Sequence, residues 1–321
     1  MDSDGVHSAC ELRVRSAQAV IPGTSLSASR VGLGTHALHR LVSRAARQDL
    51  LARAYELGVR YFDTAPSYGA GVAERALGRF ARGRRSRLVL TTKFGIAPDR
   101  LAGAIPGWLY AAMAVRAVAG ALGTRRRFTR PPVRDFSAAA VRASVEKSLH
   151  SLGTDYVDIL YLHEPTLQLL GDAQPLVREL EGLKTCGKVR YIGLAGQESE
   201  CARVARAQPA LAQILQLEVA RDSDGLPVAQ ISRHAAVRFW EFAAPDRGTL
   251  RRERLAQIVT RLTAVTSGSI LMISTNSAPE LRQAVALIEN PPFRQPTLRR
   301  LPARTEHAMH YVGPVTLEEQ R

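Results

Sequence analysis

Short apolar runs alternate along this chain with segments in which apolar residues recur every three or four positions. The recurring spacing predicts helices, and the short continuous runs are typical of strands buried in a parallel sheet. The predicted strands span residues 31–34, 59–62, 88–93, 156–163, 189–194, 211–217, 237–242 and 270–274. The predicted helices span residues 43–57, 72–81, 137–152, 175–186, 250–265 and 279–288. This alternation predicts an α/β fold, a parallel (β/α)8 barrel of the TIM type.

One segment interrupts the alternation after the third strand. Residues 101–123 are apolar apart from breaks at Pro106, at several glycines and at Arg116. We interpret residues 101–130 as an inserted helical lid that carries Trp108–Tyr110 toward a substrate, because barrel enzymes build such loops at this end of their strands. Packing against the outside of the barrel is an equally open alternative. The central arginine and the helix breakers argue against a membrane span.

The remaining segments define the expected domain limits. The barrel is expected to span residues 26–292. Residues 1–25 show no strong periodicity and are expected to form a poorly defined N-terminal segment. After Pro291-Pro292 the chain becomes basic and irregular, so residues 293–321 are expected to form a separate C-terminal tail.

Composition narrows the classes of function. The 321 residues carry a formal net charge of +15, and 45% of them are hydrophobic, which is ample for a core. The positive charge comes almost entirely from scattered arginines without interleaved aromatic residues, so we expect no nucleic-acid partner. The same charge favours anionic ligands, including a phosphorylated cofactor. Three cysteines without metal-like spacing and the lack of a signal-peptide pattern favour a reducing, cytoplasmic location, and no feature specifies an oligomeric state.

Four polar side chains follow the ends of three consecutive predicted strands. Asp63 follows the strand 59–62, Tyr68 lies five residues later, Lys93 ends the third strand and His163 ends the fourth. Because the carboxyl ends of parallel strands meet at one face of a barrel, we expect these groups to lie within reach of one another. Taken singly, each has a plainer explanation, such as packing, surface exposure, a satisfied core histidine or a turn cap.

The sequence around these residues resembles the aldo/keto reductase family. The segment Arg60–Ala65, followed by Tyr68-Gly69 and Glu74, is similar to the signature of that family. Lys93 after Leu90–Thr92, His163 after Leu160–Leu162, and the segment Gly187–Gly193 match three further family motifs in order. The resemblance covers roughly residues 31–289 and is clearest as far as Gly193. It implies an NAD(P)H-dependent oxidoreductase that acts on a small carbonyl or alcohol substrate.

The resemblance also implies how the four residues would act. Tyr68 would serve as general acid and base, donating a proton to the substrate oxygen as hydride arrives at carbon. A free phenol has a pKa of about 10, and the ammonium of Lys93 would make the phenol a readier acid. Asp63 would neutralise and orient Lys93, and His163 would hydrogen-bond the carbonyl oxygen. Hydride and proton both have sources, so this chemistry needs no metal.

Further positions are implied for a cofactor, with NADP favoured over NAD. The chain lacks the third glycine of a Rossmann fingerprint after Gly32 and Gly34, so any dinucleotide is held in another way. The implied contacts are Thr35, Asp63, Gln216, Ser274, Asn276, Ser277 and Arg282, the last four near the adenosine phosphate. Trp240 or Phe242 would stack under the nicotinamide.

The pattern departs from the family at one cofactor contact. Where the family usually places a Ser-Asn pair that holds the nicotinamide carboxamide, this chain has Ala195-Gly196, unless Gln197 or the backbone replaces it. The stretch 243–267, which precedes the last strand, is also shorter than in the family. An alternative is therefore a catalytically weak or inactive barrel that acts as a binding or regulatory protein.

Overall fold

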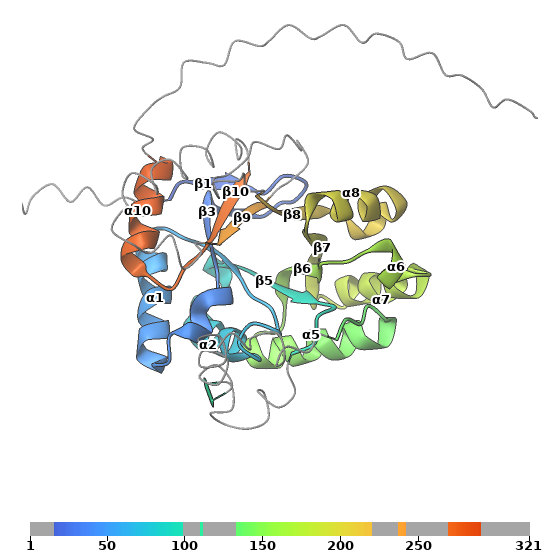
Figure 1. Ribbon diagram of the computed structural model, residues 1–321, viewed down its shortest axis with the longest axis horizontal. Coiled ribbons are helices and arrows are strands. Elements are labelled where there is room, and N and C mark those ends of the chain that lie inside the picture. The colour runs from blue at the N-terminus through green and yellow to red at the C-terminus, as the bar shows by residue number, and fades with distance from the viewer. Residues whose placement is uncertain (1–15, 99–109, 112–132, 220–236, 242–268, 290–321) are drawn as a thin grey trace, which may run out of the picture. The chain divides into compact units, whose positions relative to one another are not determined.

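The computed structural model describes residues 16–98, 110–111, 133–219, 237–241 and 269–289, and all of them belong to one compact unit (Figure 1). Several predictions fall outside these ranges: most of the lid 101–130, Phe242, the stretch 243–267 with its helix 250–265, and the tail 293–321. Among the helices that the structure describes, none is both long enough and apolar enough to cross a bilayer.

Eight parallel strands close into a barrel, as predicted, in the order β10-β3-β4-β5-β6-β7-β8-β9. Their bounds are Val31–Gly34 (β3), Tyr61–Asp63 (β4), Val89–Phe94 (β5), Val157–His163 (β6), Val189–Gly196 (β7), Ile214–Glu218 (β8), Val237–Glu241 (β9) and Ile270–Ser274 (β10). Sequential strands are neighbours throughout, and the pairing of β10 with β3 completes the barrel.

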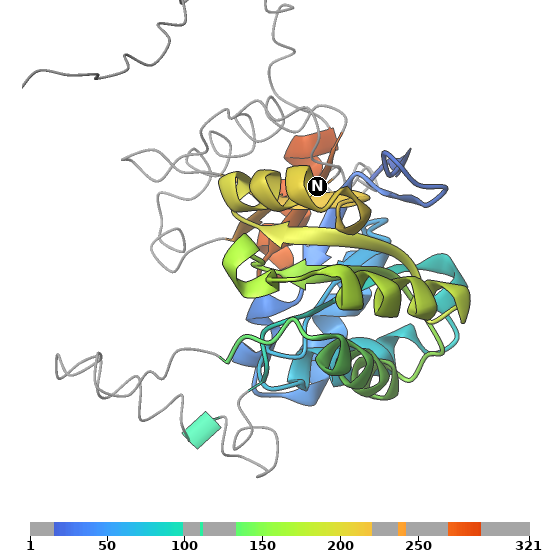
Figure 2. The ribbon, with the colours of Figure 1, turned by 90° about the vertical axis from the view of Figure 1, so that its right-hand side faces the viewer.

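Helices surround the strands (Figure 2). Their bounds are Arg44–Glu56 (α1), Val72–Ala81 (α2), Ala138–Leu152 (α5), Leu167–Leu170 (α6), Gln174–Thr185 (α7), Glu198–Ala207 (α8) and Ala278–Glu289 (α10), with 3-10 turns at His36–Arg40 (η1), Arg85–Arg87 (η2) and Pro209–Leu211 (η4). In Figure 2, α5, α7 and α8, coloured from green to yellow, cover one side of the barrel. The N-cap predicted for α5 is confirmed, because the Ser137 hydroxyl accepts a hydrogen bond from the amide of Ala140 at 3.2 Å.

Several element boundaries differ from the predictions, and the helices α6 and α8 were not predicted. Strand β7 continues to Gly196, and β8 begins only at Ile214 because the preceding residues form the turn η4. Helix α8 buries only Cys201 and Val204. This apolar stripe is too short to stand out in the sequence, since amphipathic helices are recognised by a repeated apolar face.

An N-terminal hairpin contributes to the interior of the barrel. Strands β1 (Gln18–Val20) and β2 (Ser27–Ser29) pair antiparallel, across the predicted domain limit at residue 26. Ile21, Leu26 and Ala28 are buried among inward-facing strand residues such as Ile159 and Ile270. The hairpin therefore adds apolar side chains to the centre of the barrel.

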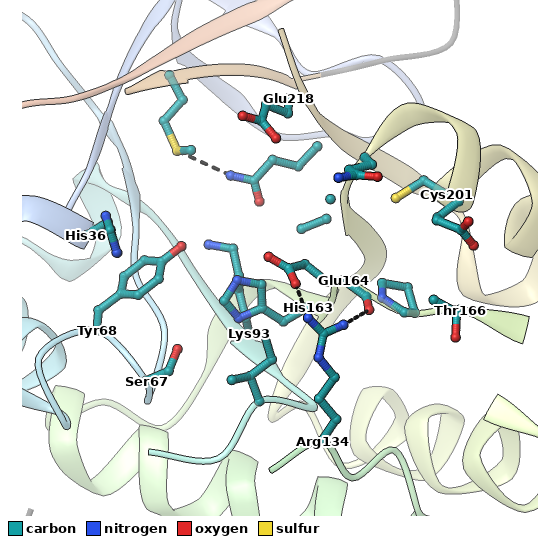
Figure 3. A pocket seen from close by; sticks show the side chains of 18 of the residues that line it. His36, Ser67, Tyr68, Lys93, Arg134, His163, Glu164, Thr166, Cys201 and Glu218 are labelled. Carbon is teal, nitrogen blue, oxygen red and sulfur yellow. Dashed lines mark hydrogen bonds and ion pairs between the residues drawn. The ribbon is translucent and has the colours of Figure 1, made fainter. Parts of the chain in front are cut away.

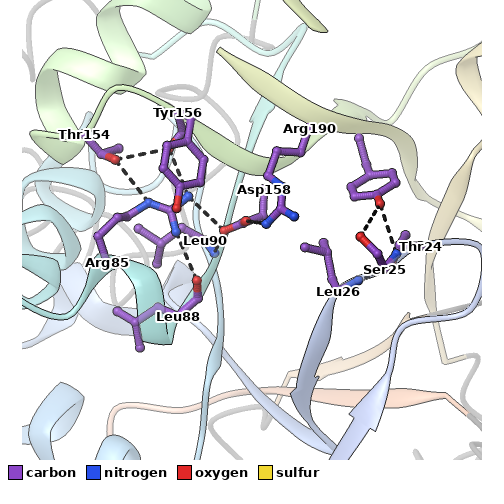
Figure 4. Close-up of polar contacts among 11 residues, drawn as sticks. Thr24, Ser25, Leu26, Arg85, Leu88, Leu90, Thr154, Tyr156, Asp158 and Arg190 are labelled. Carbon is purple, nitrogen blue, oxygen red and sulfur yellow. Dashed lines mark hydrogen bonds and ion pairs between the residues drawn. The ribbon is translucent and has the colours of Figure 1, made fainter. Parts of the chain in front are cut away.

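A buried carboxylate joins three strands near their amino ends (Figure 4). Asp158 of β6, 2% exposed, accepts a hydrogen bond from the backbone amide of Leu90 on β5 at 2.9 Å. It also forms ion pairs with Arg85 at 2.8 Å and with Arg190 of β7 at 2.9 Å. Since Leu90 lies on β5, Arg85 lies just before β5 and Arg190 lies on β7, Asp158 ties β6 to both neighbouring strands.

Replacing this carboxylate is expected to destabilise the barrel. Asp158→Ala leaves a buried amide without an acceptor and two arginines without their counterion, and should lower the free energy of unfolding by about 3 kcal/mol. Urea unfolding followed by circular dichroism measures the change. Asp155→Ala, at an exposed position three residues earlier, is the control and should change stability by less than about 0.5 kcal/mol. Equal effects of the two substitutions would contradict the assigned role of Asp158.

Candidate active site

The structure brings the four predicted residues together at the carboxyl ends of β4, β5 and β6. Asp63 is the last residue of β4, and Tyr68 lies in the loop that follows it. Lys93 is the fifth residue of β5, and His163 is the last residue of β6. Because these strands are neighbours in the barrel, their ends place the four side chains around one mouth (Figure 3).

Asp63 and Lys93 form a buried ion pair. Their side chains are 0% and 3% exposed, and the Lys93 ammonium contacts one carboxylate oxygen of Asp63. The other oxygen accepts a hydrogen bond from the Thr91 hydroxyl at 2.7 Å, and Lys93 also donates to the carbonyl of Thr64 at 3.2 Å. Burial lowers the pKa of Lys93, and the neighbouring carboxylate opposes that shift. Asp63 therefore favours the charged ammonium in a site that would otherwise disfavour it.

The Lys93 ammonium lies near the Tyr68 ring, which in turn contacts two histidine rings. Its nitrogen lies 5.0 Å from the centre of the Tyr68 ring. The Tyr68 ring meets the His163 ring edge to face, with centroids 5.9 Å apart, and the His36 ring in the same way at 5.0 Å. Figure 3 shows the Tyr68 hydroxyl and the Lys93 amine pointing toward one another beside the His163 ring. This is the arrangement in which an ammonium stabilises a phenolate.

The environment of His163 favours its neutral form. Burial lowers its pKa well below the ordinary 6.5, and the positive charge of Lys93 adds to the shift, followed by His36 and Arg134. A neutral imidazole has one N–H, so His163 can donate one hydrogen bond into the cavity without carrying a charge. In this form His163 is a hydrogen-bond donor and not a source of protons near neutral pH.

The same shift makes the protein sensitive to acid. The unfolded chain protonates this imidazole below about pH 6.5, whereas the folded chain resists protonation, so stability is fully present above about pH 6.5 and falls as the pH decreases. The contribution of His163 is expected to reach about 1.4 kcal/mol per pH unit. The measurement is urea unfolding between about pH 7 and pH 5, compared with His163→Gln.

The variant should lose less stability than the parent over this range. His150→Gln, which removes an exposed imidazole from α5, is the control and should follow the parent. The buried carboxyl of Glu74, whose pKa is raised mainly by burial, acts in the opposite direction but is common to all three proteins. A parent and a His163→Gln variant with the same pH slope would refute the neutral imidazole.

Tyr68, Lys93 and His163 border a cavity of about 630 Å³, within the range of small-molecule sites. Its lining comprises His36, Ser67, Tyr68, Lys93, Ile96, Arg134, His163, Glu164, Pro165, Thr166, Ala195, Gly196, Gln197, Glu200, Cys201, Gln216, Glu218, Met272 and Ser274. Asp63 lies behind Lys93 rather than on the wall. Tyr110, expected to face a substrate, is not part of the wall; its hydroxyl accepts a hydrogen bond from Arg47 of α1 at 2.6 Å.

Gln216 is the predicted cofactor contact with the clearest unmet hydrogen-bonding capacity. Its side chain is fully buried on β8, in register with Ala195 of β7. The amide nitrogen lies 3.3 Å from the sulfur of Met272, while the amide oxygen is buried and has no hydrogen-bond partner among the described residues. A buried acceptor left unpaired is costly, so this oxygen fits a ligand that brings an N–H donor.

The other predicted cofactor residues divide into three groups. Ser274 lines the cavity, and a Cβ at Gly34 would lie 2.3 Å from its hydroxyl, so the glycine makes room for it. Thr35 is buried, and both its amide and its hydroxyl donate to the carbonyl of Asp63 at 2.9 Å. Asn276 and Ser277 directly precede α10, and Arg282 lies in its first turns. None of these three residues lines the cavity.

The start of α10 is capped by its own side chains. The Ser277 hydroxyl accepts from the amide of Glu280 at 3.4 Å, and the Thr275 hydroxyl donates to the Glu280 carboxylate at 2.7 Å. The helix N-terminus attracts anions, while Glu280 adds a negative charge at the same place. These two effects oppose one another for a ligand phosphate.

The pair Ala195-Gly196, where the sequence departs from the family pattern, lies on the cavity wall. Ala195 and Gly196 end β7, and a Cβ at Gly196 would lie 3.2 Å from the Cα of Glu164. Glu164 itself adopts a φ of 53°, which is uncommon for a residue with a side chain. Gln197, the suggested substitute for the missing pair, does line the cavity and is exposed there.

Several residues on the wall were not identified from the sequence. Arg134 forms an ion pair with Glu164 and donates to its carbonyl at 3.1 Å, which joins the segment before α5 to the loop after His163 (Figure 3). Glu218 and Cys201 complete the opposite side. The only available signal was position: Glu164 and Glu218 each follow or end a barrel strand. Trp240 lies on β9, and Phe242 lies outside the described residues, so the predicted stacking residue stays a prediction.

Comparisons with known proteins show which proteins the chain is similar to. Residues 30–221, more than half of the chain, match the model of the aldo/keto reductase family. The chain is 34% identical over 202 residues to a D-threo-aldose 1-dehydrogenase of a Pseudomonas species, which covers 60% of this chain and 55% of that protein. It is 31% identical over 183 residues to an L-galactose dehydrogenase of Arabidopsis thaliana, with coverages of 54% and 46%.

A third relative uses a different cofactor from the one predicted here. The chain is 29% identical over 185 residues to an NADH-specific methylglyoxal reductase of Escherichia coli, covering 55% of this chain and 51% of that protein. The chain thus spans about half the length of the curated relatives it matches.

Solved structures share the fold. The holo form of an aldo-keto reductase from Bacillus halodurans superposes with a TM-score of 0.57 at 18% identity, covering 87% of this chain and 93% of that one. A glycerol dehydrogenase from Gluconobacter oxydans also gives a TM-score of 0.57, at 19% identity, with coverages of 84% and 89%.

Proposed function

The chain belongs to the aldo/keto reductase family, and from this premise we propose that it interconverts a small carbonyl compound and the corresponding alcohol with a nicotinamide cofactor. The observation that carries the proposal is the cluster of Tyr68, Lys93 and His163 at one wall of a cavity, with Asp63 behind it. A bound nicotinamide would supply or accept the hydride at its C4 atom. The protein must then supply the proton and hold the oxygen.

Tyr68 is the proposed proton donor. Its hydroxyl points toward the Lys93 ammonium, whose positive charge stabilises the phenolate left after proton transfer. The ion pair with Asp63 keeps that ammonium in place and charged. In the oxidative direction the same phenolate accepts the proton of the alcohol, so one group serves both directions.

His163 is proposed to aim the substrate oxygen. A neutral imidazole donates one hydrogen bond to an oxygen that gains negative charge, and its edge-to-face contact with Tyr68 brings the two donors to the same side of the cavity. The paired donors would hold a carbonyl oxygen between them. Glu164 and Arg134, farther along the wall, are then placed to contact the rest of a substrate.

The cofactor is proposed to be held by Gln216 and by the residues implied by the resemblance. The unpaired oxygen of Gln216 fits the carboxamide N–H of nicotinamide, and Gln197 would take over part of the role of the missing Ser-Asn pair. Thr35, together with the backbone of Asp63, would shape the floor. NADP is proposed over NAD because of Ser274, Asn276, Ser277 and Arg282.

Titration of the intact chain with NADPH and NADH, followed by nucleotide fluorescence, tests this proposal. Binding in the micromolar range, tighter for NADPH, is expected, and a screen of aldehydes, ketones and sugars should then give turnover. Cytoplasmic location stays part of the proposal and is tested by fractionation. No binding of either nucleotide below about millimolar would exclude ordinary catalysis.

That outcome would favour the second candidate function, a binding or regulatory barrel. The specific observation in its favour is the pair Ala195-Gly196, which offers no side-chain hydrogen bonds where the family usually has two such groups. A regulatory barrel would keep the fold and the buried Asp63–Lys93 pair as structural features, without turnover of any carbonyl in the screen.

Removing the Gln216 amide should separate cofactor binding from stability. Gln216→Leu is expected to weaken NADPH binding by about tenfold, because the carboxamide loses its acceptor, with no loss of thermal stability. Gln213→Leu is the matched control: its side-chain oxygen accepts the amide of Ile192 at 3.0 Å, outside the cavity wall. It should cost about 1 kcal/mol of stability and leave NADPH affinity unchanged. Unaltered NADPH affinity in Gln216→Leu would exclude the carboxamide contact.

A further inference from the structure

A second cavity lies in the layer of helices, apart from the strand ends. Helix α2 packs between α1 and α5 (Figure 1). Arg75, Arg79 and Arg82 recur at intervals of four and three residues, so they lie along one side of α2 and just beyond its end. Together with Arg44 of α1 and the end of α5, they line a cavity of about 550 Å³, called here the arginine groove. Its complete lining is Arg44, Arg75, Gly78, Arg79, Arg82, His150, Ser151, Leu152 and Gly153.

The arginine groove concentrates positive charge, and no carboxylate is part of its lining. Its lining contains four arginines and a histidine but no carboxylate, and none of the four arginines forms an ion pair within the described part of the chain. The acidic residues nearest in sequence are used elsewhere. Asp49 pairs with Arg53 at 3.5 Å, and Glu74 is buried, where it accepts a hydrogen bond from the Thr92 hydroxyl at 2.9 Å.

Arg79 is the groove arginine with an unsatisfied hydrogen-bond donor. Its Nε atom is buried without a hydrogen-bond partner among the described residues. Burial lowers the pKa of Arg79, and the positive charges of Arg44, Arg47, Arg75 and Arg82 shift it in the same direction. The folded chain therefore holds several cations together at an energetic cost, and an anion in the groove would remove that cost.

We propose that the arginine groove binds a soluble small anion that carries two or more phosphate groups. Guanidinium groups bind phosphate through two parallel hydrogen bonds, and four of them around one hollow match a ligand with several negative charges. A groove of this volume, lined by residues of α1, α2 and the end of α5, has room for a small molecule. The groove and the proposed catalytic cavity share no lining residue, so this site is independent of the proposed function.

Isothermal titration of the full chain with inorganic tripolyphosphate tests the proposal. The triple variant R75Q/R79Q/R82Q is expected to weaken tripolyphosphate binding by at least about tenfold. The matched control R87Q/R178Q/R206Q removes the same charge from exposed positions outside the groove and should bind as the parent does. Circular dichroism checks that each variant is folded. The single variant Arg82→Gln changes an exposed position and should weaken tripolyphosphate binding less than the triple variant does.

Three results would overturn the proposal. Tripolyphosphate could fail to bind the parent at low salt. Alternatively, both triple variants could weaken tripolyphosphate binding equally, which would mean that binding depends on net charge alone. A short single-stranded RNA or vesicles with anionic lipid could bind in a groove-dependent manner while tripolyphosphate neither binds nor competes. Groove-dependent binding of tripolyphosphate would support the proposal even if no carbonyl compound is ever turned over.

Discussion

Tyr68→Phe is expected to abolish carbonyl reduction while leaving NADPH affinity near that of the parent. The phenylalanine keeps the ring between His36 and His163 and removes only the hydroxyl that points toward Lys93. Loss of a positioned proton donor commonly costs a factor of about 10²–10⁴ in rate. The measurement is kcat for the best carbonyl substrate found in the screen, together with a fluorescence titration of the cofactor.

A matched control is available inside the same barrel. Tyr61→Phe makes the same chemical change at a buried residue whose hydroxyl bonds to Tyr161 at 3.0 Å, outside the catalytic cavity. It should change kcat by less than about threefold, although it costs about 1 kcal/mol of stability. If Tyr68→Phe retained most of the parent's kcat, Tyr68 would lose its proposed role, and a proton source elsewhere on the wall would have to be sought.

Asp63→Asn and Lys93→Met are expected to impair both stability and catalysis. Each substitution leaves one charge of the pair buried without its counterion, which typically costs about 3–5 kcal/mol of folding stability. Catalysis should fall by at least about a hundredfold in either variant, because Tyr68 loses the charge that stabilises its phenolate or the carboxylate that holds that charge.

The double variant D63N/K93M separates the two effects. Because it leaves neither charge unpaired, it should recover part of the stability lost in the single variants and should remain as inactive as Lys93→Met. Urea unfolding and steady-state rates on all four proteins complete the cycle. Strictly additive stability losses would show that the two side chains are not energetically coupled.

These experiments also distinguish the two candidate functions. In a regulatory barrel the Asp63–Lys93 pair would still couple in stability, because burial alone requires it. Only an enzyme would show the selective loss of turnover in Tyr68→Phe. Stability data alone therefore report on the fold. A loss of kcat at unchanged cofactor affinity reports on the chemistry.

The sequence alone predicted the barrel and the four clustered residues, for a physical reason. Buried parallel strands are mainly apolar, so each strand was visible as a mostly apolar run, and the polar residue that closes such a run lies near the strand end. Lys93 is a polar residue that closes such a run within its strand, and His163 closes the next one. The closed order of the strands then brings these ends together without any further information.

Other features were decided only by the tertiary structure, because they depend on contacts between distant segments. The unpaired oxygen of Gln216, the ion pair between Arg134 and Glu164, and the close approach of Gly196 to Glu164 each join elements that no sequence period links. The arginine groove arises in the same way, since α1, α2 and α5 contribute to it from separate parts of the chain. Hydrophobic periodicity reports which face of an element is buried, but the partner that a polar side chain meets is set by how the elements pack.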